Sequence, residues 1–134
     1  MRQLIALILI LIHTPGWAQT FYNNYSQWKS LNQSQKMGYV SGAMDRHLGL
    51  GSQDEEPYVL AEKSGVGRCL TDLEITNTML AEAVTKHYEN NLGHWDTLPA
   101  IVLSGVVQSI CLKFINNSRI QYGLSPPWKK WEGY

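Results

Sequence analysis

Residues 100–115, AIVLSGVVQSICLKFI, form the most apolar segment of the chain beyond its N-terminal region. Large apolar side chains return every three or four residues along one face and its flank: Leu103, Val107, Ile110 and Phe114, with Val102, Val106 and Cys111 beside them. So broad an apolar surface predicts a central helix that other helices cover on several sides. Pro99 falls in its first turn, where a missing amide hydrogen costs nothing, and Asp96 or Thr97 would cap it.

A stripe of large residues between Trp28 and Leu48 also keeps mostly helical spacing. Polar residues 32–34 interrupt the stripe, which predicts a short helix followed by a longer one that ends at Gly49. Within the longer helix, Gly38 and Gly42 are four residues apart. Each glycine costs a helix interior roughly 1 kcal/mol relative to alanine. We therefore expect a neighbouring helix to approach closely at these two glycines.

The middle of the chain divides into a loop and a third helix. Residues 49–68 are rich in glycine and contain an acidic run, so we expect a long loop with at most one helical turn at residues 58–62. Residues 71–74, Thr-Asp-Leu-Glu, have the form of a capping box and predict the start of a helix that stops near residues 90–93. No segment of useful length has strand periodicity. The predicted fold is all-α, a compact bundle of three to five helices.

The N-terminal region has the three parts of a secretory signal peptide. Arg2 precedes an uncharged apolar run over residues 4–12, a Pro-Gly break follows, and small residues stand at positions 16 and 18. This pattern predicts a cleaved signal peptide over residues 1–18, with an uncleaved anchor as the alternative. The helical domain would then occupy residues 19–116, and residues 117–134 would form an aromatic, proline-containing tail held to the surface by its tryptophans.

Export bears on the two cysteines and on the charge. An even cysteine count in an oxidising compartment predicts one disulfide, Cys69–Cys111. Without Arg2, ten basic residues (11 − 1) stand against 11 acidic residues, and this near-neutral balance argues against nucleic-acid binding. No later segment has the apolar length expected of a membrane span.

Catalytic and metal-binding patterns are weak. The order G-x-x-S-G around Ser41 differs from the nucleophile turn G-x-S-x-G and sits in a helical pattern without a preceding strand. The charged residues nearby exclude a membrane dimerisation face for Gly38 and Gly42. A metal site built from His87, His94 and an acid stays open, but no histidine or cysteine pair has zinc-ligand spacing. We predict a protein that is not an enzyme, without metal or cofactor.

Two loops carry side chains suited to binding a partner. One is the segment between the last two predicted helices, with a tryptophan at its tip: His94, Trp95 and Asp96. The other combines an acidic run with an aromatic residue: Asp54, Glu55, Glu56 and Tyr58. Tryptophan and tyrosine are common interface anchors, and long loops on small scaffolds are often functional. The alternatives are that Trp95 folds back into the core and that the acidic run is merely solvated.

Taken in order, these elements resemble the Tai-type (Rap/Tai group) immunity proteins of type VI secretion systems. The resemblance covers about residues 25–115. It rests on a glycine-containing helix, a helix that follows a cysteine and ends in an aromatic residue, and an apolar helix ending in a cysteine: Gly38, Tyr39, Val40, Gly42, Ala43 and Asp45; Cys69 and Tyr88; Pro99, Ala100 and Cys111. The family's early additional cysteines, and a proline soon after the first matched cysteine, are missing here.

The resemblance implies a periplasmic, non-catalytic protein that binds and inhibits a secreted peptidoglycan amidase effector. It also implies a homodimer that inserts a loop into the substrate cleft of the amidase. The contact residues of the family vary with the effector, so the two loops above are expected contacts on physical grounds alone. The alternatives are a periplasmic acid-stress chaperone and a small-ligand carrier that uses a cavity between helices.

Overall fold

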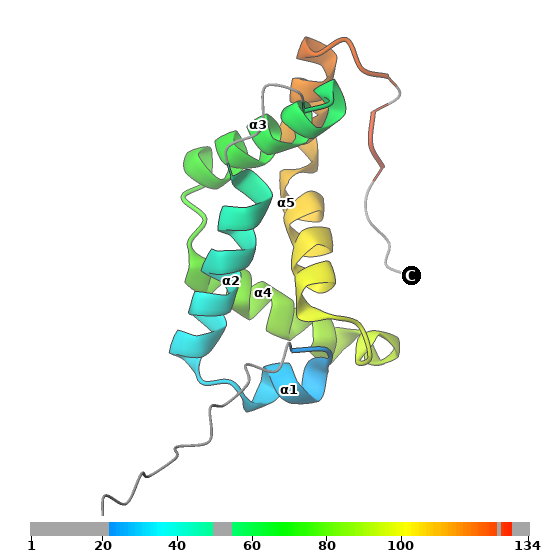
Figure 1. Cartoon of the computed structure of the whole chain (residues 1–134). Helices are drawn as coiled ribbons and strands as arrows, with labels where there is room; N and C mark the ends of the chain where they lie inside the picture. Colours follow the sequence, from blue (N-terminus) through cyan, green and yellow to red (C-terminus); the bar gives the residue numbers. More distant parts are fainter. Residues whose placement is uncertain (1–21, 50–54, 126, 130–134) are drawn as a thin grey trace, which may run out of the picture.

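The computed structural model describes residues 22–49, 55–125 and 127–129, and within them five α-helices and one 3₁₀-helix form an all-α bundle (Figure 1). The elements are α1 (Tyr25–Ser30), α2 (Gln33–Leu48), α3 (Pro57–Asp72), α4 (Asn77–Asn90), η1 (Leu92–His94) and α5 (Pro99–Gln121). The all-α prediction is confirmed. The expected signal peptide over residues 1–18, Asp54 and Trp131 lie outside the described residues.

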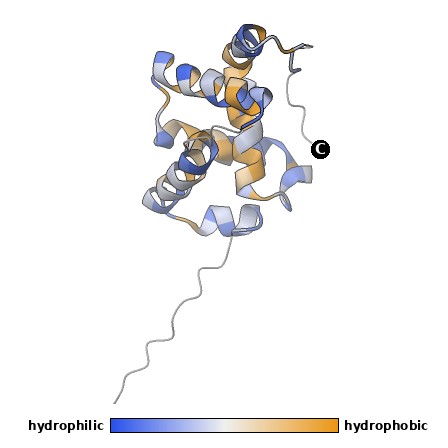
Figure 2. Cartoon of the chain, turned by 45° about the horizontal axis from the view of Figure 1, so that its top comes forward, coloured by the Kyte–Doolittle hydropathy of each residue, from blue (hydrophilic) through white to orange (hydrophobic). Residues whose placement is uncertain are grey.

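Helix α5 is the centre of the bundle, as its sequence predicts. It supplies five apolar side chains to a core to which α1 to α4 also contribute: Val102, Leu103, Val107, Cys111 and Ile115. Figure 2 shows the hydrophobic residues gathered along α5, with hydrophilic residues on the outer faces of the surrounding helices. The expected apolar face is displaced by part of a turn, since Ile110 is exposed. Contrary to the sequence prediction, α5 is long and apolar enough to meet the criterion for a membrane-spanning helix, a criterion that core helices of soluble proteins meet too.

Helices α3 and α5 run antiparallel and meet backbone to backbone. A Cβ atom placed on Gly65 would lie 2.5 Å from the Cα atom of Ile115, so only glycine permits this approach. One turn further along both helices, a disulfide joins Cys69 to Cys111 with their Cα atoms 5.5 Å apart. The predicted disulfide is therefore present, and it lies one turn from the contact between Gly65 and Ile115.

The prediction of a long loop over residues 49–68 is wrong for most of that segment, because residues 57–72 form α3. Pro57 stands at the start of the helix, where its fixed backbone angle and missing donor are tolerated. Gly65 lowers the helix propensity of the sequence but makes the contact with α5 possible. Tertiary packing thus overrides local propensity in this segment.

The capping box predicted at residues 71–74 is also wrong, since these residues end α3. Glu74 adopts a positive φ of 51°, and the amide of Ile75 donates to the carbonyl of Leu70 at 2.9 Å. The amide of Glu74 donates to the carbonyl of Thr71 at 3.2 Å. These two bonds form a Schellman motif with glutamate at the position that glycine usually occupies. Helix α4 begins later, and its cap is the Thr76 side chain.

No described residue makes the expected helix contact at Gly38 and Gly42. Both glycines lie on the exposed side of α2, and a Cβ atom on either would have no neighbour within 4 Å. Other features of α2 agree with its sequence. Asn32 and Gln35 form a reciprocal capping box at its start, and the helix ends at Leu48 before Gly49.

The C-terminal tail is fastened to α5, which continues five residues beyond the expected boundary at residue 116. The Asn116 side-chain amide accepts from the backbone amide of Trp128 at 2.7 Å and donates to its carbonyl at 3.1 Å. The Arg119 guanidinium lies 5.3 Å from the centre of the Trp128 ring. The expectation of a tail held by tryptophan is confirmed for Trp128. At the other end of α5, Leu98 takes the cap position in place of Asp96 or Thr97.

The glycines provide a matched pair of substitutions. Gly65→Ala should destabilise the fold by about 2 kcal/mol or more, because the added methyl group collides with the α5 backbone. Gly42→Ala should stabilise it by about 0.5–1 kcal/mol, because the site is helical and open. Chemical denaturation followed by circular dichroism measures both changes. Equal effects of the two substitutions would contradict the assigned helix contact.

Candidate protein-binding surface

The connection between α4 and α5 carries a group of exposed apolar side chains, here called the η1 surface: Leu92, Trp95, Leu98 and Ile101. Their exposed fractions are 70%, 48%, 43% and 39%. Four such residues within ten positions are unusual for the solvent-facing part of a small domain, and exposed apolar groups of this kind mark interaction sites. They come from η1, from the turn after it and from the start of α5.

Trp95 is exposed but firmly held. Its indole Nε1 donates to the carbonyl of Tyr88 at 2.9 Å, and its own carbonyl accepts from the amide of Tyr25 at 2.9 Å. The Trp95 ring lies 5.2 Å from the Tyr25 ring, which stacks on Tyr88 at 5.0 Å. The Tyr88 hydroxyl then donates to the carbonyl of Thr97 at 2.6 Å. The core therefore fixes both the backbone and the side chain of Trp95.

A histidine pair lies beside this aromatic cluster. His87 Nε2 and His94 Nδ1 are 2.7 Å apart, so one nitrogen donates to the other. Burial, and then the charge of His94, lower the pKa of His87. The neutral form of His87 is favoured as a result, and the contact ties η1 to the last turn of α4.

The two predicted contact regions do not form one surface. His94, Trp95 and Asp96 lie together at the η1 surface, with Asp96 exposed. Glu55 and Glu56 precede α3, whose first turn lies near the C-terminal end of α5, whereas η1 precedes the N-terminal end of α5 (Figure 1). The 23 residues of α5 correspond to roughly 35 Å at the usual helical rise.

The acidic region is partly engaged within the chain. Glu55 pairs with Lys63, whose Nζ lies 2.5 Å from Glu55 Oε1. Glu56 is exposed at the cap position of α3 without a side-chain capping bond, and Tyr58 is 52% exposed. This region therefore offers one aromatic side chain and one unpaired carboxylate among its described residues, a smaller apolar surface than that around Trp95.

Sequence reasoning located Trp95 but missed the apolar residues that surround it. Leu92, Leu98 and Ile101 look like core residues in a linear pattern, and only the orientation of η1 and α5 exposes them. Within the described residues, no third histidine, cysteine, aspartate or glutamate joins His87 and His94 as a metal-ligand group. The histidine pair is accounted for by its hydrogen bond.

Comparison of the chain with models of protein families, with curated proteins and with solved structures gives no match. The functional assignment therefore rests on the residues and on the geometry described above.

The histidine pair predicts a pH-dependent stability. A histidine whose pKa is lowered by folding stabilises the fold above its unfolded value of about 6.5, and this contribution is lost as the pH falls through the lower folded value. The midpoint temperature of thermal unfolding should therefore decrease as the pH is lowered from about 7.5 to about 5.5. His87→Gln should reduce this decrease in the midpoint temperature. His94→Gln should reduce it partly, because the charge that repels protonated His87 is removed.

Thermal melts followed by circular dichroism at the two pH values measure the difference. A fall in midpoint that is identical in the wild type and in His87→Gln would show that His87 does not sense the folded environment.

Proposed function

We propose that this chain is a non-catalytic inhibitor that binds one partner protein through the η1 surface. The observation that carries this proposal is the state of Trp95, which is half exposed while its backbone and its ring nitrogen are both held by the core. Tryptophan is among the residues that dominate binding energy at interfaces. A side chain already fixed in its bound orientation also loses little conformational entropy on binding.

The surroundings of Trp95 suit a protein interface. Leu92, Leu98 and Ile101 add apolar area around a central aromatic residue, and the exposed carboxylate of Asp96 adds a polar group at its edge. Apolar centres with polar edges are the common arrangement of protein–protein interfaces. The η1 surface enters a cleft of the partner protein.

The partner that we propose is a secreted peptidoglycan amidase effector of a type VI secretion system, met in the periplasm. The resemblance to Tai-type immunity proteins supports this choice, together with the signal-peptide pattern at residues 1–18 and the disulfide between Cys69 and Cys111. An amidase of this type works with a cysteine–histidine pair in an open cleft. A tryptophan with a neighbouring carboxylate fits such a cleft by filling it and by pairing with the histidine.

The same resemblance implies a homodimer, and a second exposed apolar surface offers a place for it. A groove of about 400 Å³ runs beside α4 and holds Leu73, Met79 and Ile110, each at least 42% exposed. Glu82 and Lys86 line the same groove one helical turn apart. Antiparallel packing of two α4 helices would set Glu82 of each copy against Lys86 of the other, a self-complementary arrangement typical of twofold interfaces.

The test uses the amidase encoded beside the gene for this chain and follows its clearing of purified peptidoglycan. We expect wild-type protein to inhibit the amidase, and Trp95→Ala to weaken inhibition at least about 30-fold, equivalent to about 2 kcal/mol. Tyr58→Ala serves as the matched control, because it removes an equally exposed aromatic residue from the other predicted region. It should change inhibition less than about threefold.

Light scattering of the complex gives the number of copies of each chain. Equal losses for Trp95→Ala and Tyr58→Ala, with both variants folded, would remove the η1 surface from the interface. Absence of an amidase gene from the neighbourhood, combined with suppression of client aggregation at low pH, would favour the chaperone alternative.

A further inference from the structure

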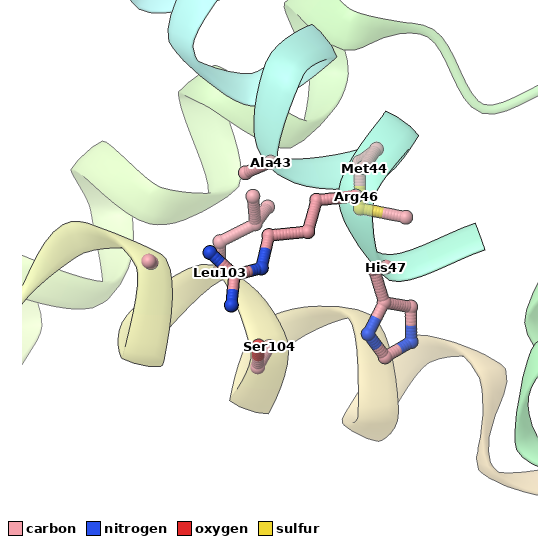
Figure 3. Close-up of a pocket in the computed structure, with 7 residues that line it drawn as sticks. Ala43, Met44, Arg46, His47, Leu103 and Ser104 are labelled. Atoms are coloured by element: carbon pink, nitrogen blue, oxygen red, sulfur yellow. The ribbon is translucent and has the colours of Figure 1, made fainter. Parts of the chain in front are cut away.

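A groove of about 430 Å³ lies between α2 and α5, away from the residues of the η1 surface (Figure 3). Its floor is apolar and belongs to the core, because Met44 and Leu103 are only 7% and 2% exposed. The small side chains of Ala43 and Ala100 face the same space and leave it open. A volume of this size is in the range of sites for small molecules, which often form between the helices of bundles.

One lining residue of the groove also contacts a third helix. His47 Nε2 lies 3.5 Å from Glu62 Oε1 of α3. The groove is here called the slot, and its lining residues are Ala43, Met44, Arg46, His47, Ala100, Leu103 and Ser104.

Cationic and polar groups stand along the open side of the slot. Arg46 and His47 extend from α2 toward α5, and Ser104 of α5 lines the same groove (Figure 3). No described residue forms an ion pair with Arg46. His47 Nε2 is buried and makes no hydrogen bond, because its approach to Glu62 is an ion-pair contact only. The Arg46 guanidinium and the Ser104 hydroxyl are thus the polar groups that the slot offers to a ligand beside its apolar floor.

We infer that this slot binds a small amphipathic carboxylate of the medium-chain fatty acid class. The carboxylate would pair with the Arg46 guanidinium and accept a hydrogen bond from the Ser104 hydroxyl. The alkyl chain would lie on Met44 and Leu103. The charge of the rim and the apolar floor together favour this class over a neutral or a cationic ligand.

A protein partner fits the slot less well. Specific protein interfaces bury about 800 Å² on each side, and they need a broad surface around their anchor points. Seven residues line the slot, whereas a standard interface involves about 20–30 residues on each side. The inference is independent of the proposed inhibitor function, since it uses none of the residues of the η1 surface.

The experiment titrates the full mature chain with decanoate and follows heat of binding and the methyl resonances of Leu103 and Met44. We expect saturable binding of one decanoate per chain, with a dissociation constant of about 1 mM or below. Decanol and decyltrimethylammonium, which have the same chain without the negative charge, should bind at least about tenfold more weakly.

Arg46→Gln should weaken decanoate binding about tenfold or more and leave decanol binding unchanged. Lys113→Gln, which removes an exposed cation of α5 from outside the lining of the slot, is the matched control and should have no effect. Ser104→Leu should fill the slot and abolish binding of both ligands, while circular dichroism shows a folded chain.

Any of three results would overturn the inference: no saturable binding of decanoate, equal binding of decanol, or an equal response of the Arg46→Gln and Lys113→Gln variants. Binding that shifts the η1 resonances instead of Leu103 and Met44 would place the ligand elsewhere and overturn it as well. Inhibition of the amidase is not a readout here, so failure of one proposal leaves the other intact.

Discussion

The rest of the structure depends on the contact between α3 and α5, where the backbone at Gly65 lies against the backbone at Ile115. No other residue type fits at position 65, because a Cβ atom there would lie 2.5 Å from the Ile115 Cα atom. The Cys69–Cys111 disulfide joins the same two helices one turn away, and the Arg68 guanidinium of α3 donates to the Ser118 hydroxyl of α5, three residues beyond Ile115. The joined pair of α3 and α5 makes α5 the central helix against which the other elements pack.

Aromatic side chains then attach the remaining helices to that axis. Trp28 of α1 is fully buried, and its Nε1 donates to the Thr85 hydroxyl of α4 at 3.0 Å. Tyr88, also fully buried, connects α4 to the turn before α5 through Thr97 and supports Trp95 through its carbonyl. The same cluster that completes the core therefore presents the η1 surface. The slot between α2 and α5 arises because small residues, Ala43 and Ala100, stand where larger ones would close it.

Sequence patterns predict the parts of this structure that local chemistry determines. The apolar period of α5, the break at Asn32 and the pairing of the two cysteines all have local or compositional causes, and all are present. The errors share another cause. Residues 71–74 satisfy the capping-box pattern, but a Schellman motif uses the same residue types at the opposite end of a helix, and only the tertiary course of α3 decides between them.

The glycines and the candidate surfaces show the same limit. Gly38 and Gly42 have the spacing of a helix contact and make none with the described residues, while Gly65, in a segment that looks like loop, lies against the α5 backbone. The position of Trp95 in a short interhelical segment was predictable, but the exposure of Leu92 and Ile101 depends on how η1 and α5 are turned. The slot combines residues 43–47 of α2 with residues 100–104 of α5, so no continuous stretch of sequence indicates it.

The most direct test of the central claim is the stability of the oxidised and reduced chain in chemical denaturation, with thiols counted by mass before and after reduction. Closing a loop with a sequence separation of 42 residues should stabilise the oxidised form by about 4 kcal/mol in the chain-entropy model. We predict two protected cysteines in the native protein and a loss of stability of that order on reduction. Two free thiols in the native protein, or equal stability of the two forms, would contradict the account.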